Sequence, residues 1–79
     1  MDGSGRIRKV ISEAREALRA LGREHPNDPR PPRALGRLLS LEGRAREAEA
    51  AYREALVRAP GDVETTRLLE QLVGARGAP

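Results

Sequence analysis

Several residue types that carry chemistry or bulk are missing or nearly missing from this chain of 79 residues. It has no cysteine, which excludes disulfide bonds and thiolate metal sites. Tyr52 is the only aromatic residue, and Lys9 is the only lysine among fifteen basic side chains. No apolar run is long enough to span a membrane, and the first residues lack the apolar core of a signal peptide. We therefore expect a cytoplasmic protein without a cofactor, a metal ion or membrane contact.

Bulky apolar side chains are scarce as well. Apolar residues make up 38% of the chain, but many of them are alanines, which bury little area. Such a core depends on close approach of helices, and a domain this small often relies on further repeats, a partner or a second copy. The net charge of +3 is unevenly spread: residues 1–41 hold nine basic and five acidic side chains (+4), and residues 42–79 hold six and seven (−1).

An internal repeat appears when the sequence is shifted against itself by 34 residues, the period typical of a helix-turn-helix repeat. Nine positions between residues 13–38 and residues 47–72 are then identical. The pairs are Glu13 and Glu47, Ala14 and Ala48, Ala17 and Ala51, Arg19 and Arg53, Pro26 and Pro60, Asp28 and Asp62, Arg33 and Arg67, Leu35 and Leu69, and Leu38 and Leu72.

The apolar spacing predicts that the whole repeat region is helical. Apolar residues recur at i, i+3, i+4 and i+7, as on one face of a helix. Four helices are predicted, over residues 6–23, 31–42, 45–59 and 63–73. They form one domain over residues 6–73, between flexible segments at 1–5 and 74–79.

Residues with special backbone preferences stand near the predicted helix ends. Ser4 is the expected N-cap of the first helix, and Asp62 of the fourth. Pro31 and Pro32 fit only the first turn of the second helix, where amide protons have no intrahelical partner to lose. Gly43 is the expected C′ glycine of that helix.

Residues 29–62 resemble one complete tetratricopeptide repeat. The family pattern has a leucine-glycine pair, a later alanine, an aromatic residue, a second alanine and a terminal proline. These residues, with one further leucine of the second helix, are the expected repeat-packing set: Leu35, Gly36, Leu39, Ala48, Tyr52, Ala55 and Pro60. Gly36 and Ala48 are expected to let the two helices cross closely, and Tyr52 to fill the space that they leave. Pro32 departs from the pattern, which usually has a large apolar residue there.

The flanking segments resemble parts of neighbouring repeats. Ala14, Leu18, Leu21 and Pro26 resemble the second helix of a preceding repeat whose first helix is missing. Residues 63–73 resemble the first helix of a following repeat, or a closing cap. The resemblance implies an all-α fold, a helical-hairpin solenoid fragment of four antiparallel helices.

No catalytic constellation is recognisable in the sequence. His25 is the only histidine and adjoins Pro26 at a predicted helix end, so it is interpreted as a turn residue. Carboxylates pair with arginines at helical spacing, as Glu49 does with Arg53, which is typical of a solvated face. We predict that the chain is not an enzyme.

In tetratricopeptide modules the first helix of each repeat lines a concave groove that usually takes an extended peptide. The resemblance implies that the groove is lined here by Arg30, Arg33, Arg37, Ser40, Leu41, Glu64, Arg67 and Gln71. Arg33, Arg37 and Arg67 would form a cluster suited to the carboxylates of an acidic peptide. The lysine and asparagines of the family's carboxylate-clamp subclass are absent, so a solvated arginine-rich surface is the competing interpretation.

Self-association is also predicted. The helix over residues 6–23 carries a wider apolar stripe than the next helix can cover. The expected contact in a homodimer is either this helix or the last one. The candidate residues are Ile7, Val10, Ile11 and Leu18 of the first helix, and Leu68 and Leu72 of the last.

These patterns together predict a scaffold or adaptor that binds a protein or peptide and associates with itself. One alternative is an accessory tetratricopeptide domain of a larger enzyme or regulator. A second alternative, a non-specific nucleic-acid binder, is disfavoured because the chain has no aromatic platform for stacked bases and glutamates are interleaved with its arginines.

Overall fold

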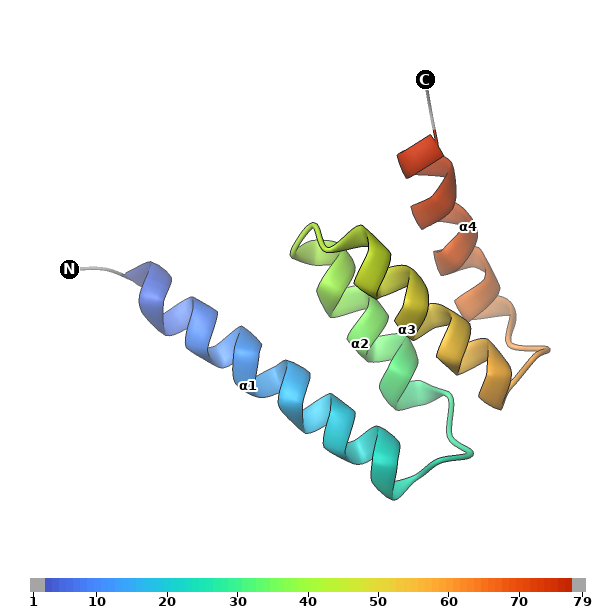
Figure 1. Ribbon diagram of the computed structural model, residues 1–79, viewed down its shortest axis with the longest axis horizontal. Coiled ribbons are helices and arrows are strands. Elements are labelled where there is room, and N and C mark those ends of the chain that lie inside the picture. The colour runs from blue at the N-terminus through green and yellow to red at the C-terminus, as the bar shows by residue number, and fades with distance from the viewer. Residues whose placement is uncertain (1–2, 78–79) are drawn as a thin grey trace.

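The structure is a computed structural model that describes residues 3–77. This part of the chain forms four helices and no strand, which confirms the all-α prediction. They are α1 (Gly3–Glu24), α2 (Arg30–Leu41), α3 (Ala45–Arg58) and α4 (Val63–Gly77). Figure 1 shows α2 and α3 as antiparallel neighbours, with α1 on one side of the pair and α4 on the other.

The helices lie beside one another in a flat, open arrangement of 46 × 39 × 15 Å. The Cα radius of gyration is 13.3 Å, whereas a compact domain of this length has about 12 Å. The cause is visible in Figure 1, where the N-terminal end of α1 projects away from the other helices. Among the described helices, the backbone of α1 lies close only to that of α2, while the backbone of α4 lies close to those of both α3 and α2.

Two helices are longer than the sequence predicted. Helix α1 begins at Gly3, so Ser4 lies inside the helix and is not its N-cap. Helix α4 continues beyond Val73 to Gly77. Isolated glycines cost a helix only about 1 kcal/mol each and do not end it, and no proline interrupts either stretch. Residues 1–2 and 78–79 of the predicted flexible segments lie outside the described residues.

The predicted helix ends around α2 are confirmed. Pro31 and Pro32 lie buried in its first turn, and the first intrahelical bond runs from the Arg33 amide to the Pro29 carbonyl at 3.0 Å. Gly43 has a φ of +78° and donates to the Ser40 carbonyl at 3.0 Å. Together with the bond from the Arg44 amide to the Leu39 carbonyl, this is a Schellman motif, which only a residue tolerant of positive φ completes readily.

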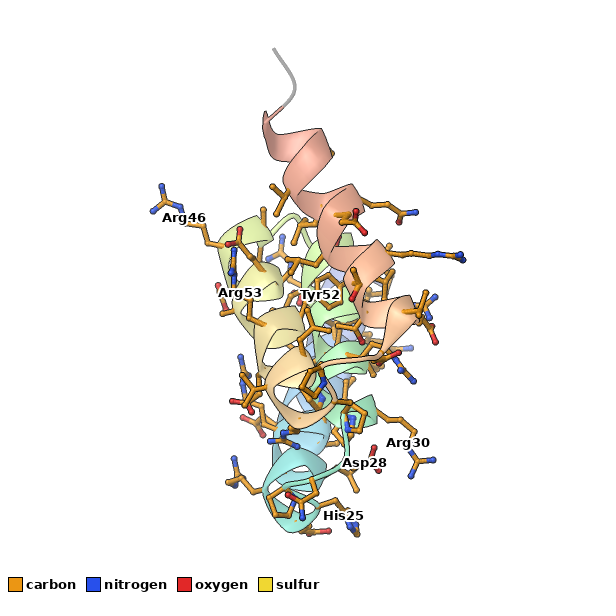
Figure 2. The ribbon with its side chains drawn as sticks, turned by 90° about the vertical axis from the view of Figure 1, so that its right-hand side faces the viewer. His25, Asp28, Arg30, Arg46, Tyr52 and Arg53 are labelled. Atoms are coloured by element: carbon orange, nitrogen blue, oxygen red, sulfur yellow. The ribbon has the colours of Figure 1, made fainter. Side chains whose placement is uncertain are left out.

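The core lies between α2, α3 and α4, and small residues dominate it. The buried apolar side chains are those of Leu39, Ala48, Ala51, Tyr52 and Ala55, with Leu35 and Leu72 packed against them. Figure 2 shows the Tyr52 ring among these helices.

The Tyr52 ring packs directly on the backbone of α2 at Gly36. A Cβ atom at Gly36 would lie 2.5 Å from two ring carbons of Tyr52. Of the expected repeat-packing residues, Gly36, Leu39, Ala48, Tyr52 and Ala55 are buried, Leu35 is half-buried and Pro60 is exposed in its turn.

The helix ends follow the period of the sequence repeat. Helices α1 and α3 end at Glu24 and Arg58, 34 positions apart, and α2 and α4 begin 33 positions apart. Helix α3 begins at Ala45, which corresponds to Ile11 of α1. The eight residues 3–10 therefore extend α1 beyond the part that has a counterpart in α3.

Candidate protein-interaction surfaces

The turn between α1 and α2 is held by two arginines. The Asp28 carboxylate accepts the Arg30 backbone amide at 2.9 Å and the Arg30 guanidinium at 3.0 and 2.7 Å (Figure 2). Arg58 donates to the carbonyl oxygens of His25 and Asp28 at 3.2 and 3.1 Å, which ties the end of α3 to this turn. The bonds from Arg30, chiefly from its side chain, lower the pKa of the Asp28 carboxyl to about 2. Arg30, a predicted groove residue, is thus paired within its own chain.

Asp62 joins α2 to the start of α4. It directly precedes α4 and accepts the Thr65 hydroxyl at 2.6 Å and the Arg33 guanidinium at 2.7 Å. Thr65 is fully buried, so its hydroxyl depends on this bond. The Thr65 hydroxyl, followed by Arg33, lowers the pKa of the Asp62 carboxyl. The predicted N-cap position of Asp62 is confirmed.

The predicted groove residues share one face of α2 and α4, named here the α2/α4 surface. Glu64 lies between two of its arginines, 3.8 Å from Arg33 and 3.7 Å from Arg37. Arg67 is exposed and has no ion pair in the described structure, and Leu41 is 86% exposed. Ser40 and Gln71 are also exposed. The structure therefore brings Arg33 and Arg37 together around acidic residues, and leaves Arg37 and Arg67 as the more accessible cations.

The two aspartates predict how stability changes in acid. Both have a folded-state pKa below the ordinary value of 3.8. The stability that they contribute is complete above that value and is lost as the pH falls from about 4 towards 2. We expect the Asp28→Asn, Asp62→Asn double variant to be less stable than the parent at pH 7 but to lose less stability between pH 4 and pH 2.

Urea unfolding followed by circular dichroism at pH 7, 4, 3 and 2 measures this effect. Glu70→Gln is the control, because Glu70 is exposed and forms no ion pair in the described part of the chain. An identical pH dependence in the double variant and the parent would contradict the assigned role of the aspartates.

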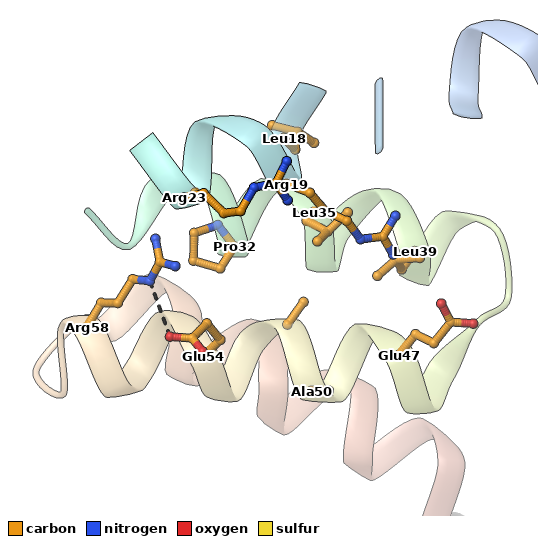
Figure 3. Close-up of a pocket in the computed structure, with 12 residues that line it drawn as sticks. Leu18, Arg19, Arg23, Pro32, Leu35, Leu39, Glu47, Ala50, Glu54 and Arg58 are labelled. Atoms are coloured by element: carbon orange, nitrogen blue, oxygen red, sulfur yellow. Dashed lines mark hydrogen bonds and ion pairs between the residues drawn. The ribbon is translucent and has the colours of Figure 1, made fainter. Parts of the chain in front are cut away.

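A cleft that the sequence did not predict opens between α1 and α3, and we name it the α1–α3 cleft (Figure 3). It has a volume of about 420 Å³, and residues of α2 lie between its two walls. This volume lies within the range of about 300–1,000 Å³ that is common for ligand-binding pockets. Its apolar lining consists of Leu18 and Gly22 of α1, Pro32, Leu35 and Leu39 of α2, and Ala50 and Ala51 of α3.

The two rims of the α1–α3 cleft differ in charge. Arg19 and Arg23 of α1 are exposed and form no ion pair among residues 3–77. On the opposite rim, Glu54 accepts Arg58 at 3.3 Å and Glu47 lies 3.6 Å from Arg44. The α1 rim therefore offers unneutralised positive charge, whereas the α3 rim is already paired.

The predicted self-association residues fall into three environments. Ile7 and Val10 are exposed on the projecting part of α1, and Ile11 and Leu18 are half-buried. Leu72 packs against the core of its own chain, so it is not free for a second copy. Leu68 is half-buried on α4. Among these candidates, the exposed side chains therefore lie on α1.

Two arginines make long-range contacts that had no counterpart in the sequence patterns. Arg15 of α1 donates to Glu42 at the end of α2 at 2.5 Å, across 27 residues. Arg58 binds backbone carbonyls 30 and 33 positions earlier. Helical spacing detects pairs three or four residues apart, so it cannot find contacts that depend on how helices cross.

Residues 3–77 contain no group of three or more metal-ligating side chains. No helix in this part of the chain is both long and apolar enough to cross a membrane. Comparison with family models, curated proteins and solved structures found no match to the chain. The resemblance to tetratricopeptide repeats thus rests on the pattern within residues 29–62.

Proposed function

We propose that the chain is a helical adaptor of the tetratricopeptide kind, which binds a short amphipathic segment of a partner protein in the α1–α3 cleft. The observation that carries this proposal is an open cleft with an apolar lining and two unpaired arginines on one rim. The helix ends at the period of the repeat support the tetratricopeptide assignment. An accessory domain within a larger enzyme or regulator would bind a partner segment in the same way.

The chemistry of the cleft defines the partner segment. Its apolar residues would contact Leu35 and Ala50, and acidic residues would face Arg19 and Arg23. An amphipathic helix laid into an apolar groove is a recurring mode of peptide recognition. Nucleic acid is a poorer ligand, because Arg30 and Arg33 on the neighbouring face are already bound to aspartates.

Peptide selection tests the proposal. The full chain is used as bait for a random-peptide display library, and enriched peptides are synthesised with a fluorescent label. We expect them to combine apolar and acidic residues. Ala50→Lys fills the cleft at an exposed position, and the Arg19→Glu, Arg23→Glu variant reverses the charge of its α1 rim. Each change is expected to raise the peptide Kd at least ten-fold, or about 1.4 kcal/mol.

Val57→Lys is the matched control, because Val57 is 76% exposed and does not line the α1–α3 cleft. It should bind the peptides as the parent does, and all variants should keep the helical circular dichroism signal. If Arg37→Glu with Arg67→Glu abolished binding while the cleft variants did not, the α2/α4 surface would be the peptide site. Failure to enrich any peptide would count against the adaptor function itself.

A further inference from the structure

A straight apolar stripe runs along α1 beside its contact with α2. Its members, named here the α1 stripe, are Ile7, Val10, Ala14, Ala17 and Leu21, spaced alternately by three and four residues. At 3.6 residues per turn they fall within an arc of about 80°. Ile7 and Val10 are 61% and 64% exposed, and Leu21 is 43% exposed. A stripe of this spacing is the seam by which one helix packs along another.

The internal repeat indicates that the α1 stripe is a surface on which another helix packs. The shift of 34 residues aligns Ala14, Ala17 and Leu21 of α1 with Ala48, Ala51 and Ala55 of α3. The three alanines of α3 are 0%, 7% and 0% exposed, and two of them pack with Leu39 of α2. Their counterparts in α1 are half-buried or exposed. In the described structure, α2 packs on this face of α3, but no helix packs on the corresponding face of α1.

We propose that α1 of a second copy of this chain covers the α1 stripe, in antiparallel orientation around a two-fold axis near Ala14. Ile7 and Leu21 are equally distant from Ala14, so each Ile7 meets Leu21 of the other copy. Ala14 and Ala17 near the axis let the helices approach closely, as the alanines of α3 let α2 approach. The contact uses the same residues on both copies and therefore closes as a dimer.

A second cleft at the C-terminal half of the stripe fits this arrangement. It lies between α1 and α2 and has a volume of about 390 Å³. Its lining residues are Leu18, Leu21, His25, Asp28, Arg30, Pro31 and Ala34. The antiparallel orientation directs the projecting residues Ile7 and Val10 of the second copy to this cleft. The most exposed large apolar side chains of α1 in one copy thus meet the apolar wall of the cleft in the other.

The charges along α1 favour the antiparallel orientation over the parallel one. Arg6, Arg8 and Lys9 lie in its N-terminal half, and no acidic residue of the helix precedes Glu13. A parallel pair would place these three cations beside the same three in the second copy. On a helical projection Arg6 and Glu24 share one flank of the α1 stripe. The antiparallel pair therefore brings Arg6 near Glu24 of the other copy, twice by symmetry.

Helix α4 is a poorer cover for the stripe. In a head-to-tail array of copies, α4 of one copy would pack on α1 of the next, in the way that α2 packs on α3 within one copy. The shift of 34 then aligns the exposed Glu70 with Gly36, the position that receives the Tyr52 ring in α2. A glutamate cannot provide that close backbone contact, and its charge would have to be buried. The polar outer side of α4 is that of a capping helix.

Sedimentation equilibrium from 1 to 500 µM, without any partner, tests the dimer. One helix pair buries less than the roughly 1,600 Å² of a standard interface, so dissociation in the micromolar range is expected. The mass should rise from that of the 8.6 kDa monomer towards twice that value. The Ile7→Glu, Val10→Glu variant should weaken association at least ten-fold. Both side chains are largely exposed, so folding should persist, as circular dichroism will verify.

Leu41→Glu is the matched control. Leu41 is apolar and 86% exposed like the residues of the stripe, but it lies on α2, and its replacement should leave the mass distribution unchanged.

Cysteine crosslinking tests the orientation, because the natural chain has no cysteine. With a short bismaleimide, Ala14→Cys should crosslink to itself, since the two-fold axis passes near this residue. Ile7→Cys should crosslink to Leu21→Cys in a mixture of the two variants but not to itself. Preferential self-crosslinking of Ile7→Cys would indicate parallel pairing and overturn the proposal.

A mass that stays at the monomer value up to 500 µM would also overturn the pairing. This outcome is separable from the adaptor function. Arg19 and Arg23 lie on the side of α1 opposite the stripe, so a monomer that still binds the selected peptides would retain the proposed function.

Discussion

Tyr52→Ala is expected to destabilise the protein by about 3–5 kcal/mol, the usual cost of replacing a buried aromatic residue by alanine. Tyr52 is 2% exposed and is the only aromatic side chain in the core. The other buried side chains of the apolar core, Leu39 and three alanines, cannot move far enough to fill the space. A domain of this length has a total stability of about 4–12 kcal/mol, so a large part of it would be lost.

Thermal and urea unfolding measure this loss, with Tyr52→Phe as the control that keeps the ring. The contact with Gly36 provides a sharper test. Gly36→Ala alone should destabilise by about 1–3 kcal/mol, because its Cβ would lie 2.5 Å from the ring. In the Tyr52→Ala background the same change should be neutral or stabilising, since the space is then free and alanine favours the helix. Equal effects of Gly36→Ala in both backgrounds would show that the two residues do not pack on each other.

Ala48→Leu is expected to destabilise the protein by about 1–3 kcal/mol through overpacking. Ala48 is 0% exposed and packs with Leu39 and Ala51, with the half-buried Leu35 and Leu72 beside them. A leucine at this position adds three carbon atoms where α2 and α3 cross. The helices would have to separate, or Leu39 would have to leave its preferred rotamer.

Ala50→Leu, on the same helix, makes the same chemical change at an exposed position. Alanine and leucine have similar helix propensities, so this variant should unfold close to the parent. Comparison of the two urea midpoints isolates the packing cost at Ala48. A parent-like midpoint for Ala48→Leu would mean that α3 presents a different face to α2.

Local features of the fold could be predicted from the sequence because their causes are local. Gly43, Pro31 and Asp62 marked helix ends correctly, since each acts on backbone groups within a few residues. The repeat of 34 residues predicted the number of helices and most of the buried set. The helix end expected at Gly74 was wrong, because α4 continues through Gly74 to Gly77.

The candidate surfaces depend on tertiary structure more than these local features do. Arg33 and Arg37 were predicted to have the same role, but only the approach of α4 decided that Arg33 binds Asp62 while Arg37 stays largely exposed. The α1–α3 cleft likewise exists because the backbone of α1 lies close to that of α2 and not to that of α3. The separation of α1 from α3 cannot be predicted from the periodicity of apolar residues within either helix.

The sequence by itself determined the helices, their caps, the small residues of the core and the excess of apolar residues on α1. These follow from backbone preferences and from the period of 3.6 residues, which act within one element. Tertiary structure alone decided which arginines are neutralised, where the clefts open, and that Leu72 faces its own core while Ile7 and Val10 face outward. Those outcomes depend on crossing geometry, which is set by the combined packing of several helices and cannot be read from any one of them.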